Sequence, residues 1–303
     1  MAQKQALQSE GEQLDEILAE LQSQQKVKEI SGWETGFPNL SRALDGILPG
    51  LYLLIGPPAC GKTSLAKQLL DQVAMHNGVP GIFFSFAEGK KELRLKTLAR
   101  LSGLECREIR RGSAYLLHWY GVPKSQHSDP ERLPPSWEKL KQSAEEARSW
   151  LELIYLIQCD RVTTLQQIED HIHKIRASKS TDRAMVVIDD SQRLGNSQES
   201  LESRLSIIAD QLQAMAVNLN APVIAIWPDL YGRREPLPEA WADRIPQADA
   251  ILVMELDVKR TEKAVEPNQA ITVHIVKNRG GDRGSLAFEF VPAFSRFVEV
   301  VSS

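Results

Sequence analysis

Beyond about residue 35, hydrophobic positions divide the chain into short apolar runs and amphipathic stretches. The apolar runs have the length of strands and lie at 51–55, 81–86, 154–157, 185–189, 222–227 and 251–255. Between several of them, apolar residues recur three and four positions apart, which predicts helices over 62–75, 165–175 and 201–215. Continuous apolar strands that alternate with helices are typical of an α/β fold, with a mostly parallel sheet covered on both faces.

The pattern changes in the last fifty residues. Segments 271–276, 286–291 and 297–301 alternate apolar and polar residues and are joined by glycine-rich turns, which predicts an antiparallel β extension at the edge of the sheet. One further stretch, 113–135, contains Trp119, Tyr120 and four prolines. It is too long and irregular for an ordinary connection, so it is either a functional insertion or a disordered loop.

The first 34 residues form a separate unit. They are rich in Gln and Glu, and Leu14, Ile17, Leu18 and Leu21 make one narrow apolar stripe at helical spacing. A lone helix of this length is marginal in water, so we expect it to dock on another surface. That surface is either its own domain or a neighbouring subunit. The chain therefore divides into a linker-like helix at 1–34 and one α/β domain at 35–303.

Composition and charge exclude several classes of protein. The 303 residues are 42% hydrophobic and 25% charged, the balance of a soluble globular protein, and no apolar run is long enough to span a membrane. The net charge of −4 provides no global basic field, so any nucleic-acid contact needs a local patch. Three distant cysteines argue against a disulfide framework and for a reducing compartment, and the polar N-terminus is not a signal peptide. We expect a cytoplasmic protein without a membrane partner.

The most specific motif follows the first apolar strand. Residues 56–63 fit G-x-x-x-x-G-K-[ST], with a strand before the motif and a helix after it, so we expect an ATP-binding P-loop. In such a loop, backbone N–H groups and the helix N-terminus surround the phosphates. Lys62 is predicted to reach the β- and γ-phosphates, and Thr63 to hold Mg²⁺. The predicted nucleotide-binding residues are Gly56, Pro57, Pro58, Ala59, Cys60, Gly61, Lys62, Thr63 and Ser64.

Three further places carry candidate chemistry. Asp189 directly follows an apolar strand, where a carboxylate beside a P-loop holds Mg²⁺ through water. Glu88 follows the second strand and either polarises the attacking water or is a surface carboxylate. The turn from Lys277 through Arg279 to Arg283 is either a solvated charged turn or carries an arginine finger for another subunit's phosphate site.

These motifs and several others together resemble a known family. The chain resembles the C-terminal motor domain of DnaB-type replicative helicases, a RecA-like family. The segments that carry the resemblance include Thr35-Gly-Phe-Pro-Asn-Leu40, Lys277-Asn-Arg279 and Gly284 through Phe297. The resemblance runs from Thr35 to about Val300. It implies a RecA-like P-loop ATPase that forms a hexameric ring and acts on single-stranded DNA. ATP would lie between subunits, with Lys277 and Arg279 supplied to it by the neighbouring subunit.

The chain departs from the family pattern at several positions. Ala87 stands where the family has its catalytic glutamate, and Glu88 is one residue late. Trp227 and Pro228 replace a serine and a glutamine that can sense the γ-phosphate, and Asp210 and Gln213 lie where the family has basic residues. The primase-interacting N-terminal domain of the replicative helicases is not expected here.

Two functions remain open at this point. The first is an ATP-driven translocase or helicase on single-stranded DNA, with Lys62, Glu88, Lys277 and Arg279 as catalytic residues and Thr63 and Asp189 as Mg²⁺ ligands. The second is a catalytically weak scaffold that binds ATP and controls the assembly of replication or regulatory proteins. The two differ in whether Glu88 supports hydrolysis.

Overall fold

The computed structural model describes residues 30–112, 135–194, 201–228, 240–262 and 268–300, together with Leu14, Leu18, Ala19 and Gln22. Within them, one sheet of nine strands has the order β3-β2-β4-β5-β1-β6-β7-β8-β9. The strands from β3 to β6 in this order pair in parallel, and β7, β8 and β9 are added antiparallel. Their bounds are β1 Gly50–Gly56, β2 Gly81–Ser85, β3 Ile154–Gln158, β4 Met185–Asp189, β5 Pro222–Pro228, β6 Ala250–Leu256, β7 Gln269–Asn278, β8 Gly284–Val291 and β9 Arg296–Glu299. The predicted mostly parallel sheet with an antiparallel C-terminal extension is confirmed.

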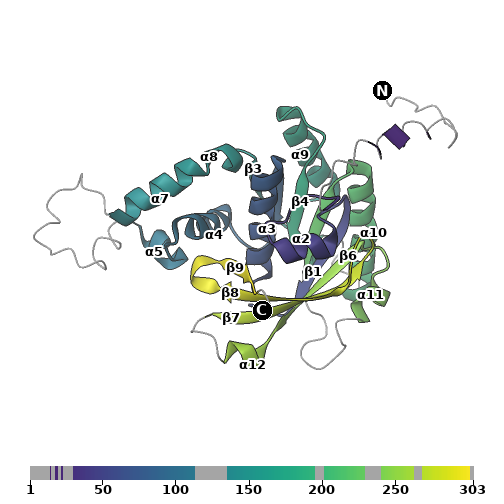
Figure 1. Cartoon of the computed structure of the whole chain (residues 1–303). Helices are drawn as coiled ribbons and strands as arrows, with labels where there is room; N and C mark the ends of the chain where they lie inside the picture. The colour runs from purple at the N-terminus through teal and green to yellow at the C-terminus, as the bar shows by residue number, and fades with distance from the viewer. Residues whose placement is uncertain are drawn as a thin grey trace, which may run out of the picture.

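Helices cover both faces of the parallel part (Figure 1). Their bounds are α2 Pro38–Leu44, α3 Lys62–Asn77, α4 Lys90–Ser102, α5 Cys106–Arg111, α7 Pro135–Glu146, α8 Arg148–Leu151, α9 Leu165–Ser178, α10 Leu201–Leu219, α11 Ala240–Arg244 and α12 Val258–Thr261. In β1, Leu51, Leu53 and Ile55 pack with α9, α10 and α11, whereas Tyr52 and Leu54 pack with α2, α3 and α4. A strand buried on both faces explains the continuous apolar runs in the sequence.

The structure confirms the predicted helices and shows where the expected limits were inexact. The capping box at the start of α9 is present, with Gln167 N donating to Thr164 Oγ1 at 3.3 Å and Thr164 N donating to Gln167 Oε1 at 2.9 Å. The second strand ends at Ser85, one residue before the predicted limit. Residues 113–134 of the irregular stretch lie outside the described residues, and α7 begins at Pro135.

The two described residues of the N-terminal apolar stripe do not pack on the domain, whereas the end of the segment does, because Trp33 pairs with Ile47. The side chains of Leu14 and Leu18 are 52% and 53% exposed, and Ile17 and Leu21 lie outside the described residues. This exposure favours the alternative in which the stripe docks on a neighbouring subunit. None of the helices in the described ranges is long and apolar enough to cross a membrane.

A buried cluster of charges joins α3 to α4. Asp71 accepts hydrogen bonds from Lys67, from Thr97 Oγ1 at 2.8 Å and from Arg100 NH2 at 2.5 Å. Lys67 is 1% exposed and Asp71 is 5% exposed, and burial lowers the pKa of Lys67 to about 8. One carboxylate therefore balances two buried cations and fixes α4 beside the helix that follows the P-loop.

Replacing Asp71 with asparagine is expected to destabilise the fold by about 3–5 kcal/mol, because it leaves two buried cations without a counter-charge. Urea unfolding at pH 7 measures the loss. Asp210→Asn, on the exposed face of α10, is the matched control and should stay within about 0.5 kcal/mol of the parent. Equal free energies of unfolding for the two variants would show that the cluster does not stabilise the fold.

Candidate nucleotide site

The conformation of the P-loop depends on Gly61, because the residues packed against it leave no room for a side chain there. Gly61 is the N-cap residue of α3 and has a φ of 87°, and a Cβ there would lie 2.9 Å from both Phe290 and Phe297. The rings of Phe290 and Phe297 stack 4.5 Å apart. Glycine is the residue that accepts both the left-handed backbone and this close approach. The loop is thus fixed between β1 and the C-terminal strands.

The lysine of the motif lies folded over its own loop. Lys62 Nζ donates to Gly56 O at 2.6 Å and to Pro57 O at 2.8 Å. The next residue has a different partner, because Thr63 Oγ1 donates to Asp189 Oδ2 at 3.0 Å. The structure therefore brings the predicted P-loop lysine, the predicted metal-binding hydroxyl and the predicted metal-binding carboxylate to one edge of the sheet.

Asp189 ends β4 and is buried. Burial raises its pKa to about 6, the charges of Glu88 and Asp190 add to the rise, and the hydrogen bond from Thr63 and the charge of Lys96 oppose it. An acidic oxygen beside a hydroxyl suits a hard divalent cation. Among the described residues no group of three or more His, Cys, Asp or Glu side chains could hold a metal. Thr63 and Asp189 fit Mg²⁺ only if phosphate oxygens and water complete its coordination, as is usual for this ion.

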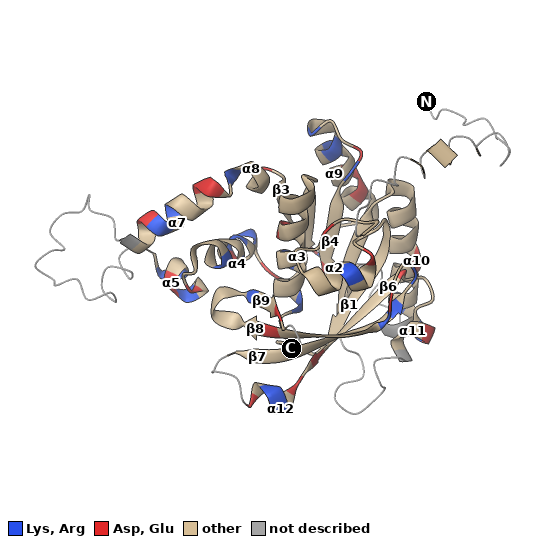
Figure 2. Cartoon of the chain, viewed as in Figure 1, with Lys and Arg blue, Asp and Glu red and all other residues tan. Residues whose placement is uncertain are grey.

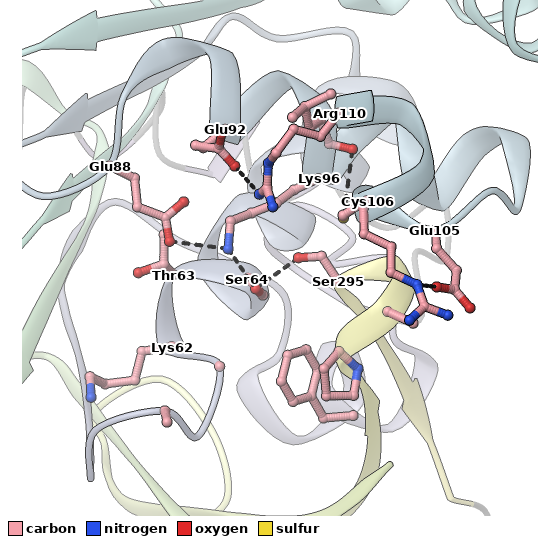
Figure 3. A pocket seen from close by; sticks show the side chains of 17 residues that line it. Lys62, Thr63, Ser64, Glu88, Glu92, Lys96, Glu105, Cys106, Arg110 and Ser295 are labelled. Carbon is pink, nitrogen blue, oxygen red and sulfur yellow. Dashed lines mark hydrogen bonds and ion pairs between the residues drawn. The ribbon is translucent and has the colours of Figure 1, made fainter. Parts of the chain in front are cut away.

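Glu88 lies in the pocket although it comes one residue late in the sequence. Because β2 ends at Ser85, the alternation of a strand no longer decides where the following side chains point. The backbone N–H of Glu88 donates to Ser85 Oγ at 2.9 Å, Ala87 is exposed, and the Glu88 carboxylate faces Lys96 at 3.1 Å (Figure 3).

The pocket around these groups has a volume of about 860 Å³. The P-loop, α4, α5 and the turn between β8 and β9 line it, and Ser64 contributes to its wall. The α5 side carries two ion pairs, Arg110 with Glu92 and Arg107 with Glu105. Charges of both signs likewise alternate along α5 and α7 in Figure 2. Sequence reasoning missed Lys96 and the wall formed by α4 and α5, because it did not predict those two helices.

Lys277 and Arg279 are not among the described residues that line this pocket. They lie at the end of β7 and in the turn after it, where Arg279 NH1 pairs with Asp249 Oδ1 at 2.6 Å and Lys277 Nζ donates to Pro246 O at 2.8 Å. The Arg279 side chain remains 64% exposed. Burial, with the charge of Arg279 adding, lowers the pKa of Lys277. Both cations are thus held at a surface away from their own chain's P-loop.

The two residues that replace the family's sensor lie beside the P-loop. In the parallel pairing of β1 with β5, Trp227 is opposite Ile55 and Pro228 is opposite Gly56. Trp227 is fully buried and its indole N–H has no hydrogen-bond partner. Neither side chain has the carboxamide of a glutamine, and Trp227 and Pro228 mainly contribute packing beside the loop.

Comparison with known sequences gives a family match over most of the chain. The sequence model of the DnaB-like helicase C terminal domain matches residues 32–299. The replicative DNA helicase DnaB of Leifsonia xyli subsp. xyli (strain CTCB07) is 23% identical, over 95% of this chain and 59% of that protein. The replicative DNA helicase DnaC of Bacillus subtilis (strain 168) is 24% identical, over 90% of this chain and 57% of that protein. The chain thus spans less than two thirds of the length of these curated relatives.

Solved structures show the same fold. A structure described as an ATPase domain matches with a TM-score of 0.76 and 20% identity, over 98% of this chain and 100% of that one. A DnaB-like replicative helicase, whose structure was described with its interactions with primase, matches with a TM-score of 0.73 and 22% identity, over 96% and 68% of the two chains. The RecA-like architecture expected from the sequence is confirmed.

The raised pKa of Asp189 predicts a pH-dependent cost to folding. Between the ordinary value of 3.8 and about 6, the folded protein binds this proton and the unfolded chain does not, so ionisation penalises the fold increasingly as the pH rises through this window. Asp189→Asn should therefore stabilise the nucleotide-free protein at pH 7 by up to about 3 kcal/mol, and the gain should vanish below about pH 4. Denaturant unfolding from pH 4 to 8 measures it, with Asp210→Asn as the control. A gain that does not change with pH would contradict the assignment.

Proposed function

The chain belongs to the family of DnaB-like helicase C-terminal domains, and from this premise we propose that it binds ATP with Mg²⁺ and hydrolyses it at subunit interfaces. The observation that carries the proposal is that Lys62, Thr63 and Glu88 line one pocket. Asp189 accepts a hydrogen bond from Thr63 beside it. Those groups supply a phosphate-binding cation, two oxygen ligands and a carboxylate for water. The nucleotide-binding residues are those of the P-loop, from Gly56 to Ser64.

Each side chain has a defined task in this proposal. Lys62 exchanges the carbonyl oxygens of Gly56 and Pro57 for phosphate oxygens, and its side chain is only partly buried. Thr63 and Asp189 hold Mg²⁺, which when bound neutralises charge on the phosphates. Glu88 accepts a proton from the attacking water, a contribution of about 10²–10⁴-fold in rate for a general base.

The second half of the site comes from another subunit. The side chain of Arg279 is exposed, and its guanidinium pairs with Asp249 Oδ1. The backbone of the turn is held as well, because Arg279 N donates to Asp249 O at 2.9 Å. An exposed cation on a fixed turn can reach an adjacent phosphate site with little loss of conformational freedom. A ring of six subunits with Lys277 and Arg279 acting in trans is the assembly that the family resemblance suggests.

The substrates and partners of the whole assembly are also part of the proposal. Single-stranded DNA in the ring, and replication or regulatory proteins bound to it, would make the domain a translocase or helicase motor. The rival is a nucleotide-controlled scaffold, and the observation that supports it is that Trp227 and Pro228 lie beside the P-loop strand in place of a serine and a glutamine. The two differ in turnover at equal ATP affinity.

Lys62→Ala should abolish ATP binding and leave the fold intact, because the lysine contacts only its own loop in the absence of nucleotide. Titration with a fluorescent ATP analogue, and ATP turnover with and without single-stranded DNA, test the proposal. Lys91→Ala, an exposed cation on α4, is the control. An unchanged affinity of Lys62→Ala for the ATP analogue would contradict the assignment of this loop as the phosphate-binding site. Tight binding of ATP without turnover in the parent would favour the scaffold.

Arg279→Ala should lower turnover by about 10³-fold or more, the typical range for an arginine finger, without loss of ATP binding. Mixing this variant with Lys62→Ala should restore activity, since such a ring pairs an intact P-loop with an intact Arg279. Arg283→Ala, in the same exposed turn, is the control. If the mixture is as inactive as its components, Arg279 does not act in trans.

Assembly should depend on the N-terminal apolar stripe. Removing residues 1–30 should lower the oligomer mass measured by light scattering, because Leu14 and Leu18 are not buried on their own domain. The double substitution Leu14→Ser with Leu18→Ser should act in the same direction, and Gln22→Ser should not. An unchanged mass in the truncated chain would show that the segment does not join subunits.

A further inference from the structure

The carboxylate proposed as the base is held by a lysine that the proposed function does not use. Lys96 lies in the middle of α4, and its Nζ is 3.1 Å from Glu88 Oε1 and 3.1 Å from Ser64 Oγ (Figure 3). The side chains of Lys96 and Glu88 are 19% and 31% exposed. We propose that Lys96 is a positioning residue that holds Glu88 against the P-loop for the attack of water. This inference rests on the proposed ATPase function and deepens it.

Glu88 needs such a partner because the sheet does not fix it. The residue lies three positions beyond the end of β2, and its backbone is tied back by the hydrogen bond to Ser85 Oγ. Its side chain retains three rotatable bonds, and confining a glutamate side chain costs conformational entropy. A general base that is misplaced by about 1 Å can lose about 10²-fold in rate. An ion pair that selects one side-chain direction is therefore worth more to the rate than to stability.

Lys96 is suited to this task because its ammonium is itself anchored to the P-loop helix. Ser64, the acceptor on its other side, is within 2.7 Å of Ser295 Oγ, and Arg100 NH1 donates to Ser295 O at 3.0 Å. The same Arg100 joins the buried Asp71 cluster, which fixes α4 beside α3. Two contacts on one ammonium therefore place Glu88 relative to Thr63 and Ser64.

The charge of Lys96 also resolves a conflict between two carboxylates. Glu88 and Asp189 are close enough for their charges to repel, and Lys96 acts against that repulsion. The other cations that line the pocket are engaged elsewhere: Arg110 pairs with Glu92, and Arg107 pairs with Glu105. Lys62 contacts carbonyl oxygens of its own loop. Lys96 is thus the cation in contact with Glu88 among the described residues of the pocket wall.

The test is Lys96→Met in the full chain, with ATP turnover at saturating ATP and the affinity for a fluorescent ATP analogue measured separately. We expect kcat to fall about 10- to 100-fold, because Glu88 loses its fixed direction. Affinity should stay within about threefold, because the phosphate ligands remain in place. Lys96→Arg should keep most of the activity, since a guanidinium also bridges a carboxylate and a hydroxyl. Lys91→Met, on the exposed face of the same helix, should behave like the parent.

A double-substitution cycle separates positioning from a general structural effect. If Lys96 acts through Glu88, adding Lys96→Met to Glu88→Gln should cause no further loss. A full additional loss in that background, or turnover in Lys96→Met equal to that in Lys91→Met while Glu88→Gln is inactive, overturns this inference alone. A parent that neither binds nor turns over ATP in a Lys62-dependent way overturns the proposed function as well. Lys96→Gln replaces the methionine variant if circular dichroism shows that the latter is misfolded.

Discussion

The site depends on the contact between the P-loop glycine Gly61 and the stacked rings of Phe290 and Phe297. The rings approach so closely that a methyl group at Gly61 has no room, and α3 is joined to β9 beside them. Gln68 Nε2 donates to Phe297 O at 3.0 Å, and Phe297 N donates to Gln68 Oε1 at 2.8 Å. The antiparallel extension therefore sets the position of the phosphate-binding loop, although more than two hundred residues separate the two in the sequence.

This contact gives the extension two tasks at its two ends. One end, at Ser295 and Phe297, fixes the P-loop helix of its own chain. The other end, after β7, holds Arg279 exposed at the surface through Asp249. The paired strands β7 and β8 join these two ends. The extension thus connects the P-loop of its own chain to the surface on which Arg279 is exposed.

The sequence predicts the strands, the P-loop and Asp189 because each has a local signal. Strands buried on both faces read as apolar runs, and the P-loop residues are contiguous. Helix α4 has no such signal: its buried positions include Leu93, Leu95, Thr97 and Ala99, two residues apart. A helix enclosed by α3, α5 and α7 has little free surface and so loses the ordinary amphipathic pattern. Sequence reasoning missed Lys96 for this reason. The side-chain positions of Lys277 and Arg279 depend on contacts with Pro246 and Asp249, which are distant in the sequence and leave no local pattern.

The position of Glu88 shows why alignment by sequence alone is a weak guide to a catalytic carboxylate. A shift of one residue reverses the face of a side chain only while the backbone remains in a strand. Here the strand ends at Ser85, two residues before Ala87, so the alternation of a strand does not apply to Ala87 and Glu88. The turn that follows places Glu88 in the pocket and leaves Ala87 exposed. The place where the chain leaves the sheet therefore decides which of the two side chains enters the pocket. A longer connection from the strand to the carboxylate is also less rigid than the strand itself. The direction of the Glu88 side chain therefore depends on side-chain contacts, such as the one with Lys96, and not on the sheet.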